Sequence, residues 1–253
     1  MKPTLLSFVV PAHNEEQLLG ATLESIHRAA QDCAIGYEVI VVNDGSTDRT
    51  ALIAEKSNAR LISVHHRQIA ATRNSGSRVA KGDVLLFVDA DTQINNVVLR
   101  SAIDAITGGA IGGGAAVRFD GCVPRYARVL LPLMIATMRV LRLAAGCFVF
   151  CTRPAFEAAG GFDERLFGAE EIALSVALKR IGRFVILRDS VLTSGRKLRT
   201  YSGFEILRII GRFAVRGRKM IEQREQMGQW YDPRRTDPAP APSKRSSNAT
   251  VGR

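Results

Sequence analysis

Two carboxylates separated by one residue, Asp89 and Asp91, directly follow the apolar run Val84–Val88. Where a chain leaves a strand end, both side chains can face a bound ligand. Carboxylate oxygens suit a hard divalent cation such as Mg²⁺ or Mn²⁺, together with phosphate oxygens and water. We therefore take this pair as a candidate metal and phosphate site, although a solvated turn has the same local pattern.

A second polar turn, Asp44-Gly45, follows another apolar run, Tyr37–Val42. The Asp44 carboxylate can accept a hydrogen bond from a ring N–H of a nucleotide base. Gly45 allows a ligand to approach the backbone closely. An ordinary Asp-Gly turn explains the same two residues, so this motif alone leaves both interpretations open.

Two further segments carry groups that could act with these carboxylates. Pro11–Glu16 brings polar side chains to the end of the first apolar run, and Glu15 and Glu16 also suit the start of a helix. Arg73 could contact a diphosphate or brace the acidic pair. It could equally be a surface arginine.

The elements that must position these groups alternate between strand and helix. The predicted strands are Leu5–Val10, Tyr37–Val42, Arg60–Val64 and Val84–Val88, and the predicted helices are Glu16–Ala30, Arg49–Asn58 and Gln68–Ala80. This alternation predicts an α/β fold with a doubly wound, Rossmann-like, mostly parallel sheet flanked by helices. Ligands bind outside the carboxyl ends of such strands, so the three polar clusters should meet along one edge of the sheet.

The second half is less regular. The predicted strands are Gly112–Phe119, Gly146–Thr152 and Arg183–Leu187, and the predicted helices are Tyr126–Leu143, Pro154–Ala159, Gly168–Ile181 and Gly203–Met227. We divide the chain into a first half at 1–110 and a second half at 111–230 that ends in a basic amphipathic helix. A disordered tail is expected at 231–253.

Taken together, the motifs resemble those of glycosyltransferase family 2. They are Pro-Ala-His-Asn-Glu-Glu from Pro11, Val-Asn-Asp-Gly-Ser-Thr-Asp from Val42, Arg-Asn-Ser-Gly from Arg73 and Val-Asp-Ala-Asp from Val88. The resemblance covers about residues 4–190. It implies the GT-A fold, with a nucleotide-sugar-binding half at 1–110 and an acceptor-binding half at 111–230. It also implies a hexosyltransferase that moves a sugar from a nucleotide-sugar, usually UDP-linked, to a hydroxyl acceptor with inversion.

The resemblance also implies roles for individual residues on the donor side. Asp44 would read the base, Asp89 would lie near the ribose and the metal, and Asp91 would be the main ligand of Mg²⁺ or Mn²⁺. The remaining positions assigned to the nucleotide site are Pro11, Ala12, Asn14, Glu15, Gly45, Arg73 and Ala90.

On the acceptor side, Gly160–Glu164 followed by Glu170-Glu171 resembles the family segment that carries the catalytic base. The family usually has Glu-Asp there, and its second acid is the base. The resemblance thus makes Glu171 the base, with Glu170 as second choice. A helix start with acids that favour the helix dipole is the alternative.

A histidine that some family members place in a late segment has no counterpart here, because no histidine follows His66. Arg196 and Lys197 lie in a comparable late position and could contact the diphosphate instead. A solvated basic loop is the alternative. Haloacid-type phosphatases also use an Asp-x-Asp motif, but this chain has Gln93 where they have Thr or Val.

Composition limits the partners. The 253-residue chain has a net charge of +11, which favours an anionic partner, and 6% aromatic residues give no base-stacking platform for nucleic acid. The brief apolar N-terminus and the arginines within Val129–Ala145 predict neither a signal peptide nor a spanning helix, so we expect a cytoplasmic protein.

Basic residues gather late in the chain, with ten Lys/Arg against two Asp/Glu over Arg183–Lys219. Arg208, Arg212 and Arg216 would share one helix face, which suits the inner face of an anionic membrane and an acceptor linked to lipid. A basic helix packed on the domain is the alternative. A non-catalytic nucleotide-sugar-binding protein of the same fold also remains open.

Overall fold

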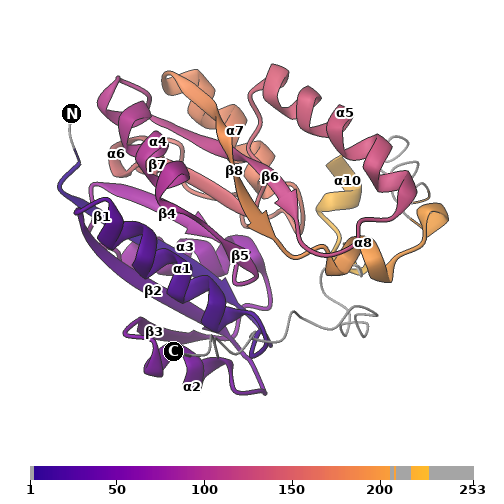
Figure 1. Ribbon diagram of the computed structural model, residues 1–253, viewed down its shortest axis with the longest axis horizontal. Coiled ribbons are helices and arrows are strands. Elements are labelled where there is room, and N and C mark those ends of the chain that lie inside the picture. The colour runs from indigo at the N-terminus through magenta and orange to yellow at the C-terminus, as the bar shows by residue number, and fades with distance from the viewer. Residues whose placement is uncertain (1–2, 206–207, 209–217, 228–253) are drawn as a thin grey trace, which may run out of the picture.

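The chain folds around one eight-stranded mixed sheet in the computed structural model, which describes residues 3–205, 208 and 218–227 (Figure 1). The strand order is β3-β2-β1-β4-β7-β6-β8-β5. The strands are β1 (Leu5–Ala12), β2 (Gly36–Asp44), β3 (Arg60–Val64), β4 (Val84–Val88), β5 (Thr92–Gln93), β6 (Gly112–Phe119), β7 (Phe148–Thr152) and β8 (Phe184–Thr193).

The first four strands are parallel, as their apolar runs and crossover lengths predict. From β1 the chain moves outward to β2 and β3, then returns to the other side of β1 to form β4. The strand order therefore reverses between β1 and β4, and ligands bind at such a reversal. Residues Ala12, Asp44 and Asp89 end or follow these neighbouring strands, so the prediction of one shared edge is confirmed.

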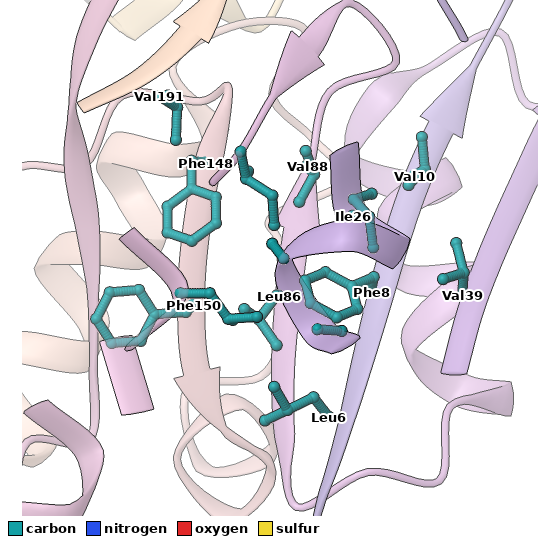
Figure 2. Close-up of a cluster of buried hydrophobic side chains, with 14 of the residues drawn as sticks. Leu6, Phe8, Val10, Ile26, Val39, Leu86, Val88, Phe148, Phe150 and Val191 are labelled. Atoms are coloured by element: carbon teal, nitrogen blue, oxygen red, sulfur yellow. The ribbon is translucent and has the colours of Figure 1, made fainter. Parts of the chain in front are cut away.

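Helices cover both faces of the sheet because both faces are apolar. The helices α1 (Leu19–Asp32), α2 (Thr50–Lys56) and α4 (Asn96–Thr107) lie on one face, and α3 (Ile69–Val79), α6 (Arg153–Ala158) and α7 (Glu170–Ile181) lie on the other. On the first face, Ile26 of α1 lies over Phe8 and Leu86 (Figure 2).

The second half adds antiparallel strand pairs, which the sequence pattern did not predict. β7 pairs antiparallel with β4 and β6, and β5 pairs antiparallel with β8. The helix α5 (Arg125–Leu141) lies beyond β6 and β8 at the rim of the molecule (Figure 1). The short helix α8 (Arg196–Thr200) follows β8.

Two predicted boundaries were wrong in ways that matter for the site. The first helix begins at Leu19 rather than Glu16, so Glu15 and Glu16 are not in its first turn. The strand predicted at Arg183–Leu187 continues as β8 to Thr193, because its pairing with β6 extends to the end of that strand. The helix α4 and the strand β5 were not predicted.

The predicted long helix Gly203–Met227 is also wrong where it is described. The helix α10 (Arg218–Ile221) ends before a separate 3₁₀ helix, Arg224–Met227. Of the basic face, Arg212 and Arg216 lie outside the described residues, as does the predicted tail at 231–253. The division at residue 110 stays a prediction, and one sheet runs through both halves. No helix in the described ranges has the length and apolarity to cross a bilayer.

Gly76 shows how closely α3 lies against the sheet. A Cβ at this position would contact Val9 and come within 2.8 Å of Val42 Cγ2. We expect Gly76→Ala to destabilise the fold by about 1–3 kcal/mol through overpacking, although alanine favours helices. Urea unfolding measures the effect. Gly20→Ala in α1 is the control, because its Cβ would lie 3.8 Å from Ile53 Cγ2. Equal stability of the two variants would contradict this packing.

Candidate functional site

The Asp89-Ala90-Asp91 turn lies at the strand reversal, where hydrogen bonds within the turn and to other segments hold its backbone. The Asp89 N–H donates to the carbonyl of Cys147 at 3.2 Å, and the Thr92 N–H donates to the Asp89 carbonyl at 3.0 Å. The hydroxyl of Thr22 in α1 donates to the Ala90 carbonyl at 2.9 Å. The backbone is thereby fixed, so the two carboxylates project from a rigid turn.

Arg73 of α3 joins this turn to the start of α7. Its guanidinium donates to Asp89 Oδ1 at 2.7 Å, to Glu170 Oε1 at 2.8 Å and to the Gly146 carbonyl at 2.8 Å. The side chain is 1% exposed and lies over the Phe162 ring, 5.1 Å from its centroid. Burial alone would lower the pKa of Arg73, but the carboxylates of Asp89 and Glu170 raise it. Of the two roles considered for Arg73, the structure shows the bracing contact.

The two glutamates at the start of α7 have different surroundings. Glu170 is buried and paired with Arg73, although burial still raises its pKa above the usual range. Glu171 is half-buried and has no salt bridge among the described residues. Burial, and then the carboxylate of Glu170, raise the pKa of Glu171 to about 8. A general base works best when its pKa lies near the working pH, so this shift is compatible with that role. The role of Glu171 as the base stays a prediction.

Two polar residues without an assigned role, Asn74 of α3 and Gln68 directly before that helix, hold the segment before α7. Asn74 accepts from the Phe162 N–H at 3.0 Å and donates to the Phe162 carbonyl at 2.9 Å. Gln68 donates through Nε2 to the carbonyls of Glu164 and Leu166. Only their burial, which local sequence does not reveal, distinguishes these amides from surface residues.

The Asp44 carboxylate organises the loop between β3 and α3. It accepts from the backbone N–H of Arg67 at 2.8 Å and of Gln68 at 3.1 Å, and from the Thr72 hydroxyl at 2.9 Å. An ionised carboxylate offers about four acceptor positions, so these three donors leave about one unused. The role of Asp44 in binding a base stays a prediction.

The loop after β1 is tied to the loop after β2. The Asn14 N–H donates to the Ser46 hydroxyl at 3.0 Å, and Asn14 Oδ1 accepts from the Thr47 N–H at 2.8 Å. Asn14 and Gly45 both have positive φ, at 50° and 61°, a conformation that Asn and Gly tolerate best. Pro11 and Ala12 end β1 beside β2.

The acids after Ala12 are paired across the site rather than along a helix. Glu15 is 7% exposed, and its Oε1 lies 3.3 Å from Nη2 of Arg196. Oε2 of Glu16 lies 3.1 Å from Nε of Arg49. The alternative that both acids serve the dipole of a helix beginning at Glu16 is therefore wrong.

Because β5 pairs with the end of β8, the basic segment that contains Arg196 and Lys197 lies beside the Asp89–Asp91 turn. The Ser194 N–H donates to the Asp91 carbonyl at 3.1 Å, and the Arg196 guanidinium lies 3.9 Å from Asp91 Oδ2. The Arg196 side chain is only 16% exposed. The alternative of a solvated basic loop does not describe Arg196, while diphosphate contacts by Arg196 and Lys197 stay a prediction.

The pKa of Asp91 is strongly shifted at this edge of the sheet. Burial, and then the carboxylates of Glu15 and Asp89, raise the pKa of Asp91 to about 7, against the opposing charges of Lys197 and Arg196. A divalent cation bound here would offset the burial and the neighbouring carboxylates, and would stabilise the ionised form of Asp91. In the part of the chain that the structure describes, no three His, Cys, Asp or Glu side chains form a ready-made metal site.

Comparison with known proteins gives one family. Residues 7–157 match the model of glycosyl transferase family 2, which is more than half of the chain. A dolichyl-phosphate beta-glucosyltransferase of Trichomonas vaginalis is 40% identical over 97 residues, which are 34% of this chain and 30% of that protein.

Solved structures share the fold at low identity. A mannosyltransferase from Pyrobaculum calidifontis, in complex with GDP-Man and Mn²⁺, has a TM-score of 0.65 and a sequence identity of 19% to this chain. The matched region covers 88% of this chain and 63% of the mannosyltransferase chain. TarS 1–349 of S. aureus with UDP-GlcNAc gives 0.60 at 19% identity, covering 89% of this chain and 70% of its own. These neighbours are GT-A glycosyltransferases, so the predicted fold class is confirmed.

Removal of Arg73 should be costly because it leaves Asp89 and Glu170 without their buried partner. We expect Arg73→Leu to lower the free energy of unfolding by about 3–5 kcal/mol at neutral pH. Arg78→Leu on the same helix is the control. The Arg78 pair with Glu164 is exposed and should contribute about 0–1 kcal/mol. Equal losses in urea unfolding would show that the buried pairing does not stabilise the fold.

Proposed function

The chain belongs to glycosyl transferase family 2, and from this premise we propose that it moves a hexose from a UDP-sugar to a hydroxyl acceptor with inversion. The observation that carries the proposal is the link through Arg73 between the Asp89–Asp91 turn and the start of α7. In this proposal the acidic turn binds the diphosphate, and the link through Arg73 keeps it close to the candidate base. Structures of the same fold that hold GDP-Man with Mn²⁺, or UDP-GlcNAc, support a nucleotide-sugar donor.

A divalent cation fits the residues at this edge. Asp91 and Asp89 offer hard oxygen ligands. Burial, and then the neighbouring carboxylates, raise the pKa of Asp91, and a bound cation would stabilise its ionised form. Two carboxylates are enough where diphosphate oxygens and water complete the ligand set, as is usual for Mg²⁺. When bound, Mg²⁺ or Mn²⁺ would neutralise charge on the leaving diphosphate.

The donor would lie along the carboxyl ends of β1, β2 and β4. In this proposal Asp44 accepts a ring N–H of the base, and Pro11–Glu15, Gly45 and Ala90 form the walls of the nucleotide site. Arg196 and Lys197 contact the diphosphate, since Arg196 already lies beside Asp91. These cations stabilise negative charge as the bond to the anomeric carbon breaks.

The acceptor hydroxyl would be activated by Glu171. The proton moves to the Glu171 carboxylate as the acceptor oxygen bonds to the anomeric carbon, and the bond from that carbon to the diphosphate oxygen breaks. Attack from the face opposite the leaving group inverts the centre. Glu170 is the weaker candidate because its carboxylate is buried against Arg73.

We extend the proposal to a lipid-linked acceptor at the cytoplasmic face of a membrane. The relative whose name includes dolichyl phosphate supports a polyprenyl acceptor, and the net charge of +11 suits an anionic surface. The second candidate function is nucleotide-sugar binding without turnover, since residues 170–171 differ from the Glu-Asp that the family usually has.

Glu171→Gln separates these two functions. We expect the variant to bind UDP-sugars with Mn²⁺ as the wild type does in calorimetry, and to lose sugar transfer by at least about a hundredfold. Glu157→Gln, at an exposed glutamate of α6, is the control and should leave both unchanged. Wild-type protein that binds no UDP- or GDP-sugar would contradict the proposed function, and full transfer by Glu171→Gln would reject Glu171 as the base.

The pH dependence of transfer reports the same group. Only ionised Glu171 accepts a proton, and its pKa in the free protein is about 8. We therefore expect kcat/KM to rise about tenfold per pH unit between pH 6 and 7.5 and to level off above pH 8. Steady-state rates at substrate concentrations below KM measure this. Rates independent of pH from 6 to 9 would contradict the assignment.

A further inference from the structure

The helix α5 carries an unusual share of the exposed apolar surface. Among the described residues, ten large apolar side chains are exposed, and five of them lie on this one helix. They are Leu130, Leu133, Met134, Val140 and Leu141. Exposure reaches 67% at Leu133 and 80% at Val140. Scattered apolar residues need no explanation, but a cluster on one helix indicates an interaction surface.

This surface extends beyond the helix at its N-terminal end. The Tyr126 hydroxyl donates to the carbonyls of Leu198 and Tyr201, and its ring lies against Gly203. The neighbouring Phe204 is 77% exposed. An exposed aromatic ring beside an exposed apolar helix is typical of segments that enter the membrane interface.

The charges of α5 point to an anionic partner. No Asp or Glu occurs from residue 121 to 156. By helical periodicity, Arg125, Arg128 and Arg139 fall on the side opposite Leu133 and Met134. An apolar face with a basic polar face is the pattern of a helix that lies in the plane of an anionic membrane.

A groove beneath the end of α5 adds to this charge. It has a volume of about 440 Å³ and is lined by three arginines and by the start of β8, namely Arg139, Arg142, Arg183, Phe184, Val185 and Ile186. Three guanidinium groups beside an apolar floor suit a phosphate with an attached hydrocarbon chain. A second copy of this chain is disfavoured, because self-pairing of α5 would bring the same arginines together without an acid from this segment.

The segment after α5 leads directly to the candidate base. The Ala144 N–H donates to the Ser175 hydroxyl of α7 at 3.1 Å, and the Gly146 carbonyl accepts from Arg73. A Cβ at Gly146 would lie 3.2 Å from the Glu171 carboxyl carbon. Only the four residues 142–145 therefore separate the end of α5 from Gly146 at the wall of the proposed acceptor site.

We propose that α5 docks the protein on an anionic phospholipid bilayer, with Leu130, Leu133, Met134, Val140 and Leu141 in the interface and the arginines among the lipid phosphates. Docking itself is independent of catalysis. The delivery of a lipid-borne acceptor to Glu171 from this surface rests on the proposed function.

Sedimentation of the full chain with vesicles tests the docking. Wild-type protein should pellet with phosphatidylglycerol–phosphatidylcholine vesicles and far less with phosphatidylcholine alone. The double variant Leu133→Asp, Val140→Asp should lower the partition coefficient by at least about tenfold, since two apolar side chains leave the interface. The control is Leu52→Asp, Val97→Asp, which changes the same residue types at exposed positions of α2 and α4 and should stay within about twofold of wild type.

A charge variant tests the second half of the proposal. Arg125→Gln, Arg128→Gln should weaken binding to anionic vesicles by about fivefold per charge at low salt, with Arg100→Gln on α4 as control. The proposal is overturned if wild type does not pellet with anionic vesicles, or if the α5 double variant and its Leu52→Asp, Val97→Asp control lose binding equally. It is also overturned if the α5 double variant only converts a dimer to a monomer in light scattering.

Calorimetry with a UDP-sugar and Mn²⁺ on the same proteins separates this inference from the proposed function. Vesicle binding that depends on α5, in a protein that binds no nucleotide-sugar, would support docking and reject the transferase. If the protein binds nucleotide-sugar and the α5 variants leave vesicle binding unchanged, the proposed function is supported and docking through α5 is rejected.

Discussion

The buried guanidinium of Arg73 is the interaction on which the candidate site depends. It forms ion pairs with Asp89 after β4 and with Glu170 at the start of α7, two segments far apart in the sequence. A guanidinium that is 1% exposed is stable only where carboxylates and carbonyls surround it. The position of α7 relative to the acidic turn is therefore set by charge as well as by the apolar contacts beneath the helix.

This arrangement concentrates negative charge on both sides of one cation. Arg73 balances Asp89 and Glu170, while Asp91 and Glu171 keep raised pKa values on the proposed donor and acceptor sides. A cation bound at Asp91 and a proton taken up by Glu171 would each relieve part of this repulsion. Both events are the ones that sugar transfer from a nucleotide donor requires, so the electrostatics of the site agree with the proposed chemistry.

Much of the donor half could be predicted because its signals are local. β3 and β4 have the predicted bounds, and parallel pairing then places Asp44 and Asp89 at one edge. The start of α1 at Leu19 was missed because Glu15 is fixed by Thr50 and Arg196 from outside the helix. The extra length of β8 was missed because it follows from pairing with β6 and β5.

The roles within the site were harder to predict, because burial depends on contacts distant in sequence. Nothing near Arg73 distinguishes a buried bridge from a surface arginine. The most direct measurement is a double-mutant cycle of Arg73→Leu and Glu170→Leu in urea unfolding. A dominant buried pair predicts a coupling energy of about 2–3 kcal/mol, with the double variant more stable than Arg73→Leu alone. Additive losses, with coupling below about 0.5 kcal/mol, would contradict the account.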